Sequence, residues 1–191
     1  MRHIVLAPST TALLVIDLQE GILQRALAPH SSETVVTNAA ALAKAVASFG
    51  GLTVRVKMDF SKLPGQPTDA QSRMPDPLPL RFSEFSSAVC SLSGPVVTKR
   101  QWGAFHDTEL DILLNRGGIT AVIIAGIATN FGVESTAREA WQHGYSVIIA
   151  EDGCSSLSRE MHEFAVHRIF PAIARVRSTG EIIHSINEAK R

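Results

Sequence analysis

Three mainly apolar runs constrain the fold of this chain more than any other feature of its sequence. They are Thr11–Ile16 (TALLVI), Ala121–Ala125 (AVIIA) and Ser146–Ala150 (SVIIA). None of the three alternates apolar with polar residues, as a strand with one solvent-facing side would. Stretches with helical spacing of apolar residues separate them. This pattern predicts strands of a parallel sheet that is covered by helices on both faces.

Weaker patterns complete an alternation of strands and helices along the chain. Further strands are expected at 52–56, 95–98 and 174–176, and helices at 34–49, 109–116, 132–143, 158–170 and from 180 onwards. The pairs Gly50-Gly51 and Gly117-Gly118 mark helix ends. The sequence therefore predicts a single three-layer α/β domain over residues 1–191, with a mainly parallel sheet of five or six strands and helices on both faces.

Composition excludes several classes of protein. The chain has 18 basic and 18 acidic side chains, and this formal net charge of +0 argues against a dedicated nucleic-acid binder. No apolar stretch is long enough for a transmembrane helix, and the N-terminal apolar run is too short for a signal peptide. The two cysteines form no CxxC pair and are too few for a disulfide framework. We expect a soluble, cytoplasmic protein without nucleic-acid or membrane partners.

Chemically suggestive residues follow three of the expected strands. Asp17 ends the first strand, Lys99 ends a later one, and the segment Gly126–Gly132 follows the central one. Ligands of parallel α/β sheets bind outside the carboxyl ends of the strands, so we expect these residues to converge. A carboxylate in a partly apolar site suits general acid or base chemistry, and a lysine can orient it. Taken singly, Asp17 could also be a cap at a strand end, and Lys99 a surface lysine.

The segment GIATNFGVESTAR, residues 126–138, is the most specific motif in the chain. It joins a buried strand to a helix N-terminus, where free backbone N–H groups can bind an oxyanion or a carboxylate. It contains neither GxGxxG nor GK[ST], which argues against dinucleotide and P-loop sites.

Four ordered blocks resemble the isochorismatase-like hydrolase family, which includes nicotinamidases and related cysteine amidohydrolases. The blocks are LLVIDLQ, TKRQWGAF, GIATNFGVESTAREA and IAEDGCSS, and they span nearly the whole chain. The resemblance implies a catalytic Asp–Lys–Cys triad, of which Asp17 and Lys99 match the first two members. It also implies a cis peptide bond between Ile127 and Ala128, and an oxyanion hole formed by the backbone N–H groups of Ala128 and Gly132.

The third catalytic position departs from the family pattern. Gly132 stands where the resemblance places the nucleophilic cysteine, so covalent thiol catalysis is not available there. Isochorismatases proper also carry glycine at this position and hydrolyse a vinyl ether with an acid and water. The residues after Gly126 lack the aromatic and histidine pattern typical of true isochorismatases, which argues against isochorismate itself as the substrate. Cys90 and Cys154 are interpreted as non-catalytic.

Neither a metal nor a cofactor is expected. The resemblance to nicotinamidases implies an Asp-x-His metal pair, but here Asp59 is followed by Phe60 and Ser61. The seven histidines are dispersed along the chain. Besides Asp17, Lys99 and Gly132, the candidate substrate-binding residues are Gln19, Trp102, Thr129 and Phe131. The aromatic residues among them could equally belong to the core.

Three functional hypotheses remain at this stage. The first is a small-molecule hydrolase that cleaves an enol ether or a C–N bond without a cysteine, with Asp17 as acid/base and Lys99 as its electrostatic partner. The second is a catalytically silent binding protein, and the third an amidohydrolase whose cysteine was replaced. Retention of both Asp17 and Lys99 favours the first. The resemblance and the proline-rich segment Ser61–Pro79 also predict a homodimer or larger assembly, with that segment at a subunit contact.

Overall fold

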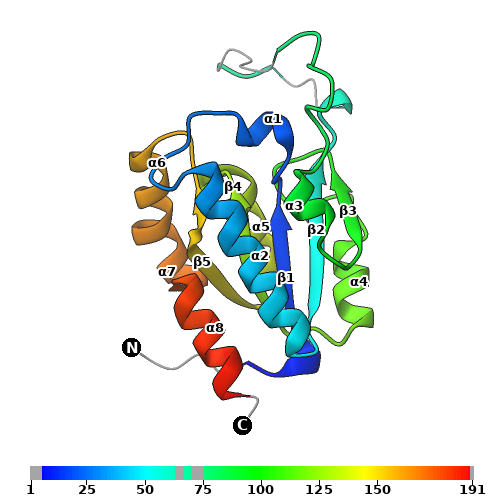
Figure 1. Cartoon of the computed structure of the whole chain (residues 1–191), viewed down its shortest axis with the longest axis vertical. Coiled ribbons are helices and arrows are strands. Elements are labelled where there is room, and N and C mark those ends of the chain that lie inside the picture. The colour runs from blue at the N-terminus through cyan, green and yellow to red at the C-terminus, as the bar shows by residue number, and fades with distance from the viewer. Residues whose placement is uncertain (1–5, 63–66, 70–74, 190–191) are drawn as a thin grey trace.

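A six-stranded sheet forms the centre of the computed structural model, which describes residues 6–62, 67–69 and 75–189 (Figure 1). The strand order is β3-β2-β1-β4-β5-β6, and all five pairs of neighbours run parallel. The strands are β1 (Thr11–Ile16), β2 (Leu52–Met58), β3 (Val96–Lys99), β4 (Ala121–Ile127), β5 (Ser146–Ser155) and β6 (Arg175–Arg177). The predicted parallel α/β fold of five or six strands is confirmed. Much of the segment Ser61–Pro79 lies outside the described residues, so its expected subunit contact stays a prediction.

Helices cover both faces of the sheet. The long helix α2 (Ser32–Ser48) packs beside α8 (Thr179–Glu188) on the face nearer the viewer in Figure 1. The opposite face is covered by α4 (Leu110–Arg116), α5 (Glu134–Gln142) and α7 (Phe170–Ile173). The remaining helices are α1 (Glu20–Leu23), α3 (Ser87–Cys90) and α6 (Arg159–Phe164). Within the described part of the chain, no helix has the length and apolar character needed to span a membrane.

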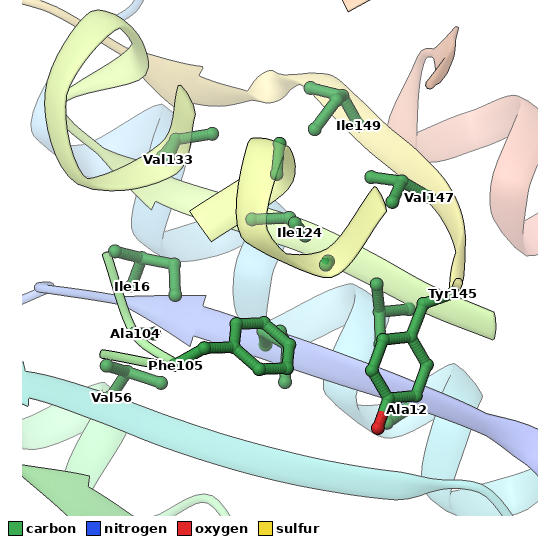
Figure 2. Close-up of a cluster of buried hydrophobic side chains, with 14 of the residues drawn as sticks. Ala12, Ile16, Val56, Ala104, Phe105, Ile124, Val133, Tyr145, Val147 and Ile149 are labelled. Carbon is green, nitrogen blue, oxygen red and sulfur yellow. The ribbon is translucent and has the colours of Figure 1, made fainter. Parts of the chain in front are cut away.

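Alternate residues of the buried strands enter two separate cores. In β1, Leu14 and Ile16 belong to the core beneath α4, α5 and α7, whereas Leu13 and Val15 belong to the core beneath α2 and α8. Figure 2 shows the first core, with Ile16 towards the carboxyl end of β1. Full burial of such a side chain contributes about 1.5–3 kcal/mol to folding. Burial on both faces explains why the central strands read as unbroken apolar runs.

Several element boundaries differ from the sequence predictions. Strand β5 continues past Ala150 to Ser155, because Cys154 and Ser155 pair with β4 after a shift in register. A π-helical turn (Thr129–Val133) precedes α5, and a second one (Ala165–Ile169) connects α6 to α7. The short helices α1 and α3 have no signature in the sequence. Each has only four residues, which is too short to show helical periodicity.

We expect Ser178→Ala to lower the free energy of unfolding by about 1 kcal/mol, because Ser178 caps helix α8. Its Oγ accepts a hydrogen bond from the N–H of Glu181, and the Glu181 carboxylate accepts one from the N–H of Ser178. Chemical denaturation would measure the change. Ser185→Ala is the matched control within the same helix, since Ser185 Oγ donates only to the carbonyl of Glu181. Equal effects of the two substitutions would contradict a capping role.

Candidate active site

Asp17 lies where the chain leaves the sheet at the end of β1. Its φ angle of 54° is in the left-handed region, which aspartate adopts more readily than most non-glycine residues. The Asp17 N–H donates to the carbonyl of Val56 at 2.9 Å, which attaches this turn to β2. The residue is only 7% exposed. The local backbone thus holds a carboxylate at the carboxyl end of the sheet, largely shielded from solvent.

Lys99 reaches Asp17 from the end of β3, with β2 between their two strands. Its Nζ lies 2.7 Å from Asp17 Oδ2, and the two side chains are 0% and 9% exposed. The Lys99 Nζ also donates to the carbonyl of Gln101 at 3.2 Å. Among the described residues, Asp17 Oδ1 has no hydrogen-bond partner although it is buried. The predicted contact between Asp17 and Lys99 is confirmed, and it engages only one of the two carboxylate oxygens, Oδ2.

The environment of Asp17 raises the pKa of its carboxyl group. Burial is the main cause, because it penalises the charged form, and the neighbouring Lys99 ammonium opposes this shift. Burying an ion pair is costly, and replacing such a pair by apolar residues often stabilises a protein. A buried carboxyl with a raised pKa beside a specific charge partner is typical of functional sites.

The segment after β4 brings the backbone close to this pair. Gly126 has a φ angle of 140°, and a Cβ there would overlap the carbonyl oxygen of Ile16, so only glycine permits this approach of β4 to β1. The peptide bond between Ile127 and Ala128 is cis, as the resemblance implies. Gly132 follows in the π turn and is buried, and a Cβ there would lie 2.9 Å from Asp17 Oδ2 and 3.6 Å from Lys99 Nζ. Gly132 therefore faces the ion pair, as predicted.

Gly132→Ala is expected to lower the rate of the catalysed reaction on the order of tenfold, because the new Cβ would displace the Asp17 carboxylate from Lys99. The added methyl would also lie 3.2 Å from Ile16 Cγ2, which leaves little room for it to move away. Steady-state kinetics would measure the effect. Gly180→Ala is a control, since Gly180 is exposed in helix α8 and the nearest atom to a Cβ there is Ser178 Oγ at 4.0 Å. Unchanged kinetics in Gly132→Ala would show that the carboxylate position is not critical.

The side chains of Gln19 and Thr129, both predicted to bind substrate, make hydrogen bonds within the protein. Gln19 is fully buried, and its Nε2 donates to the carbonyls of Met58 (2.9 Å) and Ser83 (2.8 Å). Its Oε1 accepts from the Met58 N–H at 2.8 Å. Thr129 is also fully buried, with its Oγ1 2.8 Å from His162 Nδ1. These hydrogen bonds hold the loops around the site, and direct contact of Gln19 or Thr129 with substrate stays a prediction.

Two aromatic candidates lie side by side. The rings of Trp102 and Phe131 have centroids 4.8 Å apart and planes at 62°, an edge-to-face arrangement. Trp102 is 58% exposed, while Phe131 is half-buried and directly precedes Gly132. Exposure of the indole is unusual for a core residue. Their role in binding substrate stays a prediction, as does the oxyanion role of the N–H groups of Ala128 and Gly132.

The two cysteines lie in different environments, Cys154 within β5 and Cys90 at the end of α3. Cys154 is fully buried in β5, and burial raises the pKa of its thiol to about 12. Such a thiol stays protonated and unreactive at neutral pH. Cys90 lies at the end of α3, where its Sγ donates to the carbonyl of Phe85 at 3.6 Å. These positions agree with the non-catalytic interpretation of both residues.

Three polar side chains, from β5, α6 and the segment before α2, form a cluster that was not predicted from the sequence. Glu151 Oε1 lies 3.0 Å from both His30 Nε2 and His162 Nε2. Hydrogen bonding to His162 is the main cause that lowers the pKa of Glu151 to about 2, with a further contribution from His30. His30 is 121 residues from Glu151 in sequence, so no local spacing pattern signals the cluster. The histidines judged to be dispersed in sequence are therefore partly brought together by the fold.

A parallel α/β sheet with a buried Asp–Lys pair at the carboxyl ends of its strands is the arrangement that the resemblance to isochorismatase-like hydrolases implies. Residues 11–181 match the model of the isochorismatase domain. The chain belongs to the isochorismatase family of hydrolases.

Full-length relatives support this assignment. The chain is 43% identical over 182 residues to the uncharacterized isochorismatase family protein YecD of Escherichia coli O157:H7, covering 93% of this chain and 96% of that protein. It is 39% identical over 181 residues to the uncharacterized isochorismatase family protein YwoC of Bacillus subtilis (strain 168), covering 92% and 94%. A solved isochorismatase family protein from Burkholderia thailandensis is 37% identical and superimposes with a TM-score of 0.89, over 96% of this chain and 98% of that one.

Proposed function

We propose that this protein hydrolyses a small molecule without a cysteine nucleophile, with Asp17 as the acid/base group and Lys99 as its electrostatic partner. The observation that carries this proposal is the buried 2.7 Å contact between Lys99 Nζ and Asp17 Oδ2 directly beside Gly132. Because Gly132 has no side chain that could attack, the nucleophile must be water. Direct attack by water needs a group that moves protons, and Asp17 is that group.

An enol ether suits this site best, because its hydrolysis begins with proton transfer to carbon. Burial raises the pKa of Asp17 and so favours the carboxyl form that can donate a proton. In the proposed reaction the Asp17 proton adds to the terminal alkene carbon, which gives an oxocarbenium ion. Water bonds to the cationic carbon and returns a proton to Asp17. The resulting hemiketal breaks its C–O bond to give an alcohol and a carbonyl compound.

The neighbouring groups have defined roles in this mechanism. Lys99 orients the Asp17 carboxyl and stabilises the carboxylate that forms on proton transfer. The backbone N–H groups of Ala128 and Gly132 would bind a carboxylate substituent of the substrate, and Trp102 and Phe131 would cover its apolar part. If the substrate is instead a C–N compound, the same N–H groups would hold the oxyanion of a tetrahedral intermediate, with Asp17 as base.

A substrate screen tests the proposal. Purified protein is incubated with carboxyvinyl ethers, followed by release of the keto acid, and with small primary amides, followed by release of ammonia. We expect turnover of an enol ether by the wild type and loss of turnover in Asp17→Asn. Asp59→Asn is a matched control, because Asp59 also follows a strand at this edge of the sheet. Its Oδ1 accepts hydrogen bonds from the N–H and Oγ of Ser61. Turnover that is the same in Asp17→Asn and the wild type would refute the acid/base role.

Two further outcomes separate the remaining hypotheses. Tight binding of a small molecule without turnover of any compound would favour a catalytically silent binding protein. A gain of amidase activity in Gly132→Cys would favour an amidohydrolase scaffold whose cysteine was replaced. We also propose that the protein acts in the cytoplasm as a homodimer or larger assembly. A monomeric mass from light scattering at micromolar concentration would contradict the assembly.

A further inference from the structure

We propose that His30, Glu151 and His162 form a binding site for one divalent metal ion of the zinc type. The ligand atoms of the three side chains all lie within 4.8 Å of one another. Two imidazoles and one carboxylate are the donor set of many catalytic zinc sites, in which water completes the tetrahedron. This site is separate from the Asp17–Lys99 pair, and its existence does not depend on the proposed hydrolase activity.

The distances within the cluster are close to those of a loaded site. Both imidazole Nε2 atoms lie 3.0 Å from the same oxygen, Glu151 Oε1. In a tetrahedral site with metal–ligand bonds of about 2.0–2.2 Å, neighbouring ligand atoms are separated by roughly 3.3–3.6 Å. Each imidazole nitrogen would therefore move a few tenths of an ångström away from the carboxylate oxygen to admit an ion. The two nitrogens, which lie within 4.8 Å of each other, would have to move closer together if they are not already at the tetrahedral spacing. Without metal, the two imidazoles hydrogen-bond to the carboxylate instead.

The two histidines are held in place by groups that would not themselves bind the ion. His162 is 1% exposed, and its Nδ1 lies 2.8 Å from Thr129 Oγ1, which leaves Nε2 to face Glu151. A hydrogen bond to the second ring nitrogen is the usual way in which proteins orient a metal-binding histidine. The backbone of His30 is fixed from both sides by Ser155, whose Oγ accepts from the His30 N–H and donates to the His30 carbonyl.

Partial exposure supplies an entry path and a place for solvent on the ion. The side chains of His30 and Glu151 are 25% and 33% exposed, whereas His162 closes the inner side of the site. The carboxylate and the two neutral imidazoles would leave a bound divalent ion with one net positive charge. An open coordination position facing solvent could then hold a water molecule.

Metal titration of tag-free, chelator-treated protein tests the site. Zn²⁺ is followed by calorimetry, and Co²⁺ by its visible d–d absorption, which reports the coordination geometry. We expect one ion per chain with a dissociation constant in the micromolar range or below. His30→Ala and Glu151→Gln should abolish this binding, and Thr129→Val should weaken it about 10–100-fold. His167→Ala is the matched control, because His167 is exposed in the adjoining π turn.

Each outcome of these titrations either supports or contradicts the proposed metal site. Circular dichroism and thermal melts of the metal-free variants separate loss of a ligand from loss of the fold, and Glu151→Gln preserves the shape of the side chain. Absence of stoichiometric binding by the folded wild type would overturn the proposal. Binding that persists in both His30→Ala and Glu151→Gln, or that is lost in His167→Ala, would overturn it as well, because the ion would then lie elsewhere.

Discussion

Replacing Asp17 by asparagine is expected to lower kcat by about 10²–10⁴-fold, the usual contribution of a positioned general acid or base. Asparagine keeps the size of the side chain, but it cannot donate a proton to carbon or receive one from water. Lys99 and Gly132 would still surround the same position, so binding of substrate should change less than turnover. Steady-state kinetics on the enol ether identified by the screen would measure kcat and KM separately.

The pH dependence of the wild type gives an independent test of the same role. Burial raises the pKa of Asp17, and only the protonated carboxyl can act as the acid. Activity should therefore be highest below that pKa, and kcat/KM should fall as the pH rises through it. A base role predicts the opposite slope, with activity rising over the same interval. The descending limb should be absent from the residual activity of Asp17→Asn, and its persistence would assign it to another group.

The sheet and the meeting of Asp17 with Lys99 could be predicted from sequence because both depend on simple geometry. Strands buried on two faces require apolar residues at every position, so β1 and β4 are visible as unbroken runs. Parallel strands end at the same edge of a sheet, so side chains that follow them converge. The sequence could not indicate that Lys99 passes across the end of β2, nor that Asp17 Oδ1 stays without a partner among the described residues.

The contacts of several polar residues could not be predicted, because their partners are distant in sequence. Gln19 was expected to contact substrate, but its amide bonds backbone groups of Met58 and Ser83, which are 39 and 64 residues away. Glu151 was placed after its strand because a charged residue interrupts the apolar run. Pairing of Cys154 with Gly126 nevertheless extends β5 through Glu151. The length of β5 is therefore set by its pairing with β4 more than by its local composition. The same extension of the strand places Glu151 beside His162.

Replacing one member of the buried Asp17–Lys99 pair should destabilise the fold strongly. Replacing both members together should destabilise it only weakly. Asp17→Asn leaves the Lys99 ammonium buried without a counter-charge, and such a loss costs about 3–5 kcal/mol of unfolding free energy. Lys99→Met should cost less, because Asp17 can bind a proton and become neutral, and burial favours that uncharged form. The double variant Asp17→Asn/Lys99→Met carries neither charge. We expect its stability to lie above that of Asp17→Asn, within about 1–2 kcal/mol of the wild type.

Chemical denaturation of all four proteins forms a double-mutant cycle that isolates the interaction of the two side chains. Activity measured on the same samples should be low in all three variants, including the double variant whose stability recovers. Strictly additive losses of stability would show that the two residues are not energetically coupled, and would contradict the ion pair. If the double variant recovers stability without recovering turnover, uncharged side chains can fill this site at little cost in unfolding free energy but do not support catalysis. The chain would then retain a charged pair in its interior for proton transfer and not for folding.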